Sequence, residues 1–141
     1  MRLPKSKDLQ PLLKLTRVRE KAAMAELGEV AAKRNKAAER VAALKSQRPA
    51  AESPEQAAVL EKWMIWRDQE LRARQGYLAK CTAEYLVTAK TCGRIIAEHV
   101  VVEGLTEQAE QRARSEKEAR RLEALNLLSH LLSHDVGDQD V

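Results

Sequence analysis

The 141-residue chain contains no Phe and only two Trp and two Tyr. A compact domain of this length usually builds its centre from aromatic rings, because each ring buries a large apolar area in one side chain. Glycine and proline are scarce as well, with five and four residues. These deficits argue against an α/β enzyme and against a β-sandwich.

The chain is instead rich in alanine, leucine and charged residues. Alanine alone accounts for 22 residues, and Asp, Glu, Lys and Arg together make up 33% of the chain. Such a composition is typical of long helices and coiled coils. It also argues against a disordered tail.

The charge is distributed unevenly along the sequence. Residues 1–48 carry a net charge of +8 and residues 49–141 a net charge of −4, which gives +4 for the whole chain. The two segments should attract each other, so a hairpin that pairs with itself is favoured and nucleic acid is not an expected partner.

Two further absences bear on where the protein acts. The chain has no run of 18 or more apolar residues that could span a membrane, and its basic N-terminus is not followed by the apolar block of a secretory signal. Cys81 and Cys92 are therefore expected to stay reduced, and we expect a cytoplasmic protein.

The four prolines divide the chain. Two of them fall near the start, whereas Pro49 and Pro54 enclose a turn, and Ser53 with Gln56 forms a capping box at the start of a second helix. The expected elements are a first helix over about 7–48, a turn over 49–54, a second helix over about 54–134 and a frayed acidic tail over 135–141.

Apolar residues recur at alternating steps of four and three through both predicted helices. From Leu9 to Arg48, eight of twelve such positions are apolar, and from Ala57 to Glu116, twelve of eighteen. A 3.5-residue repeat held this long imposes a left-handed supercoil between paired helices, and the short turn makes them antiparallel.

The predicted fold class is therefore all-α, a long two-helix antiparallel coiled-coil hairpin in which the second helix overhangs the first. With a tight turn, the first helix would end opposite Glu98–Val102. A break at Gly104 is the alternative, and it would let residues 105–134 fold back as a third helix.

Few residues offer chemistry. Cys81 and Cys92 lie on the predicted seam, too far apart on one helix for a disulfide or a shared metal, and His99 lies where the first helix would end. His130 and His134 share one helix face, but nothing nearby completes a ligand set. We expect no catalytic residues, no metal and no cofactor.

Two apolar patches lie off the seam. Trp63, Ile65 and Trp66 cluster near the turn, where they either bind a partner or shield their own helix. The C-terminal run either docks into another protein, self-associates, or folds back on the leucines near the N-terminus. It consists of Leu122, Leu125, Leu127, Leu128, Leu131 and Leu132.

Three segments resemble one known family. They are "LQPLLKLTRVREKAAMAELGEVAAKRNKAAERVAAL" (9–44), "RARSEKEARRLEAL" (112–125) and "LEKW" (60–63). The first has a short leucine opening, an R-x-x-E step and an Ala-rich continuation. The sequence is thereby similar to the flagellar type III export protein J and its injectisome counterpart (the FliJ/YscO family), small antiparallel coiled coils that resemble the coiled-coil part of the rotary ATPase γ subunit.

The resemblance implies a cytosolic, non-enzymatic stalk or adaptor at the inner face of the cell membrane. Its implied partners are a hexameric export ATPase, the export gate membrane protein and, in some members, export chaperones. The expected gate or chaperone contacts are Trp63, Ile65, Trp66 and Arg67. The expected ATPase contacts are Arg17, Arg19, Lys21, Arg112, Arg114, Lys117, Arg120, Arg121, Leu125 and Leu128.

Two alternatives to an export role remain open. One is a generic cytoplasmic coiled-coil scaffold. The other is a three-helix bundle that binds nucleic acid or a membrane surface through its basic first helix.

Overall fold

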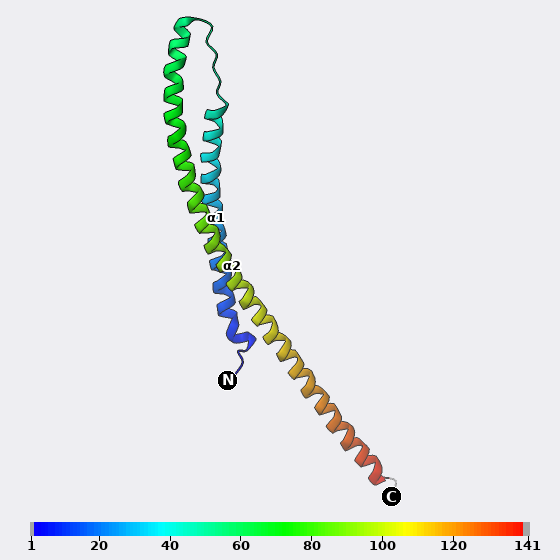
Figure 1. Ribbon diagram of the computed structural model, residues 1–141. Coiled ribbons are helices and arrows are strands. Elements are labelled where there is room, and N and C mark those ends of the chain that lie inside the picture. Colours follow the sequence, from blue (N-terminus) through cyan, green and yellow to red (C-terminus); the bar gives the residue numbers. More distant parts are fainter. Residues whose placement is uncertain (1, 140–141) are drawn as a thin grey trace. The chain divides into compact units, whose positions relative to one another are not determined.

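The computed structural model describes the backbone of residues 2–139 and the side chains of residues 2–135. It contains two helices, α1 (Ser6–Ser46) and α2 (Pro54–Gln139), which pack against each other in antiparallel directions (Figure 1). No strand occurs within residues 2–139. The predicted all-α two-helix hairpin is confirmed.

The contacts divide the chain into two compact units, and both helices contribute to each. One unit comprises Met1–Arg17 with Glu98–Val141, and the other comprises Val18–Ala97. In the first, Ser6 on α1 donates a hydrogen bond to Glu110 on α2 (3.4 Å). In the second, Lys33 donates to Glu84 (3.3 Å), and this bond raises the pKa of Lys33.

The start of α2 follows the predicted capping box. The backbone N–H of Gln56 donates to Ser53 Oγ (3.2 Å), and Gln56 Oε1 accepts from the N–H of Glu52 (2.9 Å). The other ends differ from the prediction: α1 stops at Ser46, and α2 continues past His134 to Gln139. Residues 140 and 141 of the predicted acidic tail lie outside the described residues.

The hydrophobic seam lies where the 3.5-residue repeat predicts it. Every buried residue among the described side chains occupies one of the predicted seam positions. Many are small, and small side chains let two helices approach closely, so the seam needs no Phe. The buried residues are Leu9, Leu13, Thr16, Ala23, Val30, Ala37, Val41 and Leu44 on α1, and Cys81, Cys92, His99, Val102, Thr106 and Ala109 on α2.

The predicted register of the two helices is wrong. A tight turn would place Leu44 opposite Val59, but its carbonyl accepts a hydrogen bond from Arg67 (3.3 Å). In the other unit, α1 begins beside Glu110, beyond the predicted Glu98–Val102. The reason is that residues 47–53 run extended beside the first turns of α2 instead of closing a tight turn (Figure 1).

The alternative of a third helix is also wrong, because α2 passes through Gly104 without a break. No glycine among the described residues has a positive φ, so none needs the conformational freedom of glycine. A Cβ built on Gly104 would meet no atom within 4 Å.

Replacing Gly104 by Ala should therefore raise the free energy of unfolding by about 1 kcal/mol, the difference between the helix propensities of the two residues. Urea denaturation followed by circular dichroism measures the change. A lower stability in the Gly104→Ala protein would indicate that α2 bends at this position.

Candidate partner-binding surfaces

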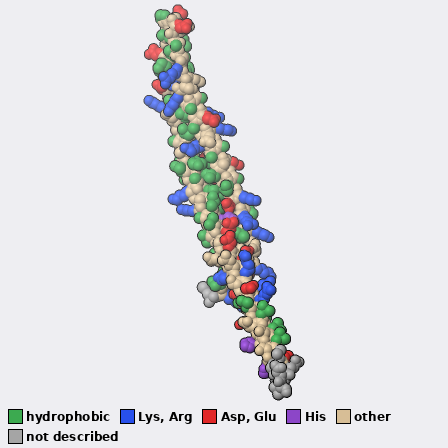
Figure 2. Space-filling view, turned by 90° about the vertical axis from the view of Figure 1, so that its right-hand side faces the viewer, with side chains coloured by type: hydrophobic (Ala, Val, Ile, Leu, Met, Phe, Trp, Pro, Cys, Tyr) green, Lys and Arg blue, Asp and Glu red, His purple; other side chains and the backbone are tan. Residues whose placement is uncertain are grey.

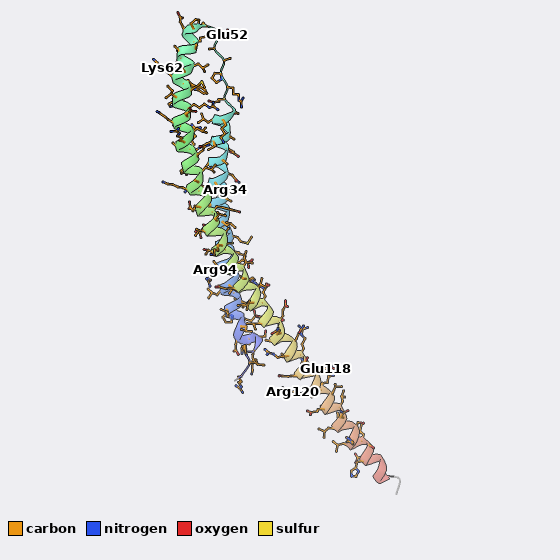
Figure 3. The ribbon with its side chains drawn as sticks, in the orientation of Figure 1. Arg34, Glu52, Lys62, Arg94, Glu118 and Arg120 are labelled. Carbon is orange, nitrogen blue, oxygen red and sulfur yellow. The ribbon has the colours of Figure 1, made fainter. Side chains whose placement is uncertain are left out.

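The C-terminal part of α2 has no helix beside it. In its unit, the Arg112 guanidinium donates to the carbonyl of Pro4 (3.3 Å), and the segment 2–7 borders a hollow that reaches Glu116. Every described side chain from Ala113 to Asp135 is exposed. We call residues 113–135 the tail. Figure 3 shows Glu118 and Arg120 on this stretch of α2, without a neighbouring helix.

The tail carries all six leucines of the C-terminal run on its surface, each 52–64% exposed. Apolar side chains are visible on this end of α2 in Figure 2. The alternative in which this run folds back on the N-terminal leucines is therefore wrong. Instead, Leu9 and Leu13 are buried in the hairpin seam. The tail leucines thus form a large apolar surface of the kind that marks interaction sites.

The basic residues predicted to contact an ATPase lie in different settings. Arg114, Lys117, Arg120 and Arg121 are exposed on the tail, together with Leu125 and Leu128. Arg112 is half-buried against the N-terminal segment and serves the hairpin. Arg17 belongs to the same unit as the tail, whereas Arg19 and Lys21 belong to the other unit. All three are exposed.

Arg67, which stays a predicted partner contact, caps the end of α1 in the hairpin. Its Nε donates to the carbonyl of Leu44 (3.3 Å) and its Nη2 to that of Lys45 (3.1 Å). Its guanidinium also lies 5.7 Å from the centre of the Trp63 ring. The last carbonyls of a helix lack partners within the helix, so Arg67 satisfies two of them. Ile65 and Trp66 remain exposed.

Replacing Arg67 by Ala should lower the free energy of unfolding by about 2 kcal/mol, because two capping hydrogen bonds and the contact with Trp63 are lost. Thermal unfolding with chemical denaturation measures the loss. Trp66→Ser, at an exposed neighbouring position, is the matched control and should change stability by less than about 0.5 kcal/mol. Equal losses in the two variants would contradict the capping role.

A groove lies where the connecting segment meets α2. It has a volume of about 660 Å³ and is lined by Glu52, Glu55, Val59, Leu60 and Trp63, among others. It exists because α1 ends at Ser46, and an extended segment fills less space than the helix that it replaces. We call it the tip groove. The predicted seam position Met64 is 50% exposed, whereas its neighbour Trp63 is half-buried.

A polar cluster interrupts the seam in the unit that holds the tail. Thr16 Oγ1 lies 2.8 Å from His99 Nδ1, and the Thr16 hydroxyl is also placed to donate to the carbonyl of Leu13 (3.0 Å). His99 Nε2 lies 3.1 Å from Glu103 Oε1. The sequence placed His99 on the seam, as a register residue or at the end of the pairing, and it is buried within the paired region. Such a pair favours one helix register over others.

Sequence reasoning missed the use of seam arginines as hydrogen-bond donors across the hairpin. Arg67 and Arg74 are seven residues apart on the seam, and Arg74 Nη1 donates to the carbonyl of Arg40 (3.2 Å). The sequence does contain a signal for this use. An arginine that recurs at a seam position keeps its guanidinium close to the partner helix, where backbone carbonyls are available.

The described cysteines and histidines, the remaining candidates for metal binding or catalysis, are not grouped into a site. Cys81 and Cys92 are buried free thiols on the seam, and His130 and His134 are exposed on the tail. Within the described residues, no three His, Cys, Asp or Glu side chains are grouped so that they could hold a metal ion.

Neither helix, over the residues that the structure describes, is long and apolar enough to cross a membrane. The sequence matches no protein-family model, no curated protein and no solved structure. Function must therefore be inferred from the surfaces described above and from the sequence resemblance.

Proposed function

We propose that the protein is a non-enzymatic coiled-coil stalk and adaptor of a type III protein export apparatus. In this proposal it acts in the cytoplasm, at the inner face of the cell membrane. Its tail contacts a hexameric export ATPase, and the surface at Ile65 and Trp66 contacts the export gate or a chaperone. The sequence resemblance and the geometry of the tail support the proposal.

The observation that carries the proposal is that α2 extends beyond the end of its pairing with α1. A single helix is about 10–12 Å wide with its side chains, so it enters a narrower opening than a helix pair does. The tail is such a single helix, because the side chains of residues 113–135 are exposed. An unpaired helix with an apolar surface suits the central opening of a ring.

The chemistry of the tail supports the same partner. Arg114, Lys117, Arg120 and Arg121 precede the leucine run and are exposed. Basic side chains steer a partner with an acidic lining, and the leucines supply apolar area that is buried only on binding. Glu116 and Glu118 lie among these four basic residues, so the segment 114–121 has a net charge of +2, and the exposed Arg17 is a further basic side chain in the same unit.

Affinity purification of the tagged full-length chain from its own cells tests the proposal. The export ATPase should be recovered, and its gene should lie near that of this chain. Recovery of unrelated cytoplasmic proteins without any export component would favour the generic scaffold. Retention on DNA or on anionic vesicles that falls with added salt would favour the nucleic-acid or membrane-surface alternative.

A further inference from the structure

Besides the leucines of the tail, the tip groove is an exposed apolar surface on the described part of the chain. Its walls are the extended segment on one side and the first turns of α2 on the other. Val59 is 68% exposed within it, and Leu60 and Trp63 are half-buried. Glu52 and Glu55 give the groove negative charge toward the start of α2. It therefore fits a helix that is apolar over one part and basic over the next.

The tail has that bipartite pattern on a single face. Helix residues seven apart lie on the same face, and Arg114, Arg121 and Leu128 follow this spacing. Leu125 and Leu132 continue the same strip toward the C-terminus. Glu118, seven residues before Leu125, lies on this strip as well, so the face changes from charged and mainly basic (Arg114, Lys117 and Arg121) to apolar along the helix, and all of these side chains are exposed.

We infer that the tail of one copy docks in the tip groove of a second copy, so that copies of this chain associate head to tail. The tail runs parallel to the start of α2 in the groove. Arg121 then lies beside Glu55. Leu125 lies beside Val59, because Leu125 follows Arg121 by four residues just as Val59 follows Glu55. Leu128 lies near Trp63 in this arrangement.

Two observations favour the groove over a second tail as the occupant. In a parallel pair of tails, Arg114, Lys117 and Arg121 would face the same residues of the other copy, and like charges oppose each other. In an antiparallel pair, arginines would lie against leucines. In addition, Leu127 and Leu131 make the apolar surface of the tail wider than the contact between two helices can cover. The groove has two walls and can cover more of it.

A contact between two different surfaces does not close on itself as a symmetric dimer does, so it can extend into chains of molecules. This inference goes beyond the proposed function and does not depend on it. It uses the same tail, however, so an ATPase that binds the tail would compete with a second copy.

Sedimentation velocity at low salt, from micromolar to millimolar protein, tests the inference. The wild-type chain should form species larger than a dimer, and added salt should weaken them. A tip variant (Glu55→Gln with Val59→Gln) and a tail variant (Leu125→Gln with Leu128→Gln) should each need at least about tenfold more protein to associate. All four residues are exposed, so the variants should keep their helicity.

Mixing the two variants is the sharpest test. The tip variant keeps a complete tail and the tail variant keeps a complete groove, so an equimolar mixture should form dimers and nothing larger. A control with Leu86→Gln and Val87→Gln, two exposed apolar residues elsewhere on α2, should associate like the wild type.

A charge exchange tests the register. Glu55→Arg alone should weaken association, and combining it with Arg121→Glu in the same chain, so that every contact carries the exchanged pair, should restore it. Failure of this rescue would overturn the proposed pairing. A wild-type chain that stays monomeric throughout would overturn the inference, and so would a tip variant that still dimerises as readily as the wild type, because the tails would then be pairing with each other.

Discussion

Replacing His99 by Ala is expected to lower the free energy of unfolding by about 3 kcal/mol. His99 is 6% exposed and fills the seam between α1 and α2 in its unit. The substitution leaves a cavity and removes the partner of the buried Thr16 hydroxyl, which lies 2.8 Å from the imidazole. It also removes the bond between the imidazole and Glu103.

Single and double variants separate packing from hydrogen bonding. Thr16→Val should cost about 1–3 kcal/mol, because the buried hydrogen bond between Thr16 and His99 Nδ1 is lost. The combined change Thr16→Val with His99→Leu should recover much of the stability, since replacing both partners of a buried polar pair by apolar groups is often nearly neutral. Urea denaturation gives all three values. A loss below about 1 kcal/mol for His99→Ala would contradict the account.

The tail variant Leu125→Gln with Leu128→Gln is expected to weaken binding to the hexameric export ATPase by about a hundredfold. Leucines buried at an interface each contribute on the order of 1–2 kcal/mol, and tenfold in affinity corresponds to about 1.4 kcal/mol. Both residues are more than half exposed in the free chain, so its unfolding should change by less than about 0.5 kcal/mol. Binding is measured by titration with the purified ATPase in dilute solution.

The variant with Leu86→Gln and Val87→Gln is the matched control, because it removes two exposed apolar residues from the same helix outside the tail. It should bind the ATPase like the wild type. Equal losses in both variants would show that general surface hydrophobicity, and not the tail, determines binding. A fall in stability of the tail variant would show instead that the leucines belong to the core.

The seam could be predicted from the sequence because the period of apolar residues alone defines it. Leu9, Leu44 and Ala109 are buried as the 3.5-residue repeat requires. The helix start at Pro54 could be predicted as well, since its cap depends on neighbouring residues only. Local signals and periodicity therefore sufficed for fold class.

The register could not be predicted in this way. A heptad pattern stays in phase when one helix slides by whole repeats, so the seam alone does not decide which residues face each other. The choice depends on the path of residues 47–53 and on long-range pairs such as Thr16 with His99 and Arg67 with Leu44. These pairs join residues far apart in the sequence.

For the candidate sites as well, what depends on local sequence could be predicted, and what depends on the register could not. The sequence pointed to Leu125 and Leu128 as surface residues because the leucine run lies in a segment that the first helix is too short to cover. That conclusion needs only the positions of leucines along the chain. Arg67 and Arg112 are predicted partner contacts, and the structure adds that both donate to carbonyls of the hairpin. An exposed basic residue and one that caps a distant carbonyl look alike in sequence, and only the register distinguishes them.

Amide hydrogen exchange along α2, in dilute free protein and in complex with the export ATPase, tests the central claim most directly. The account predicts slow exchange at the buried seam positions from Cys81 to Ala109 and fast exchange throughout the tail in the free chain, because the tail lacks tertiary packing. The ATPase should then slow exchange in the tail. A tail already protected in the free chain, or new protection confined to the region of Trp63 and Arg67, would contradict it.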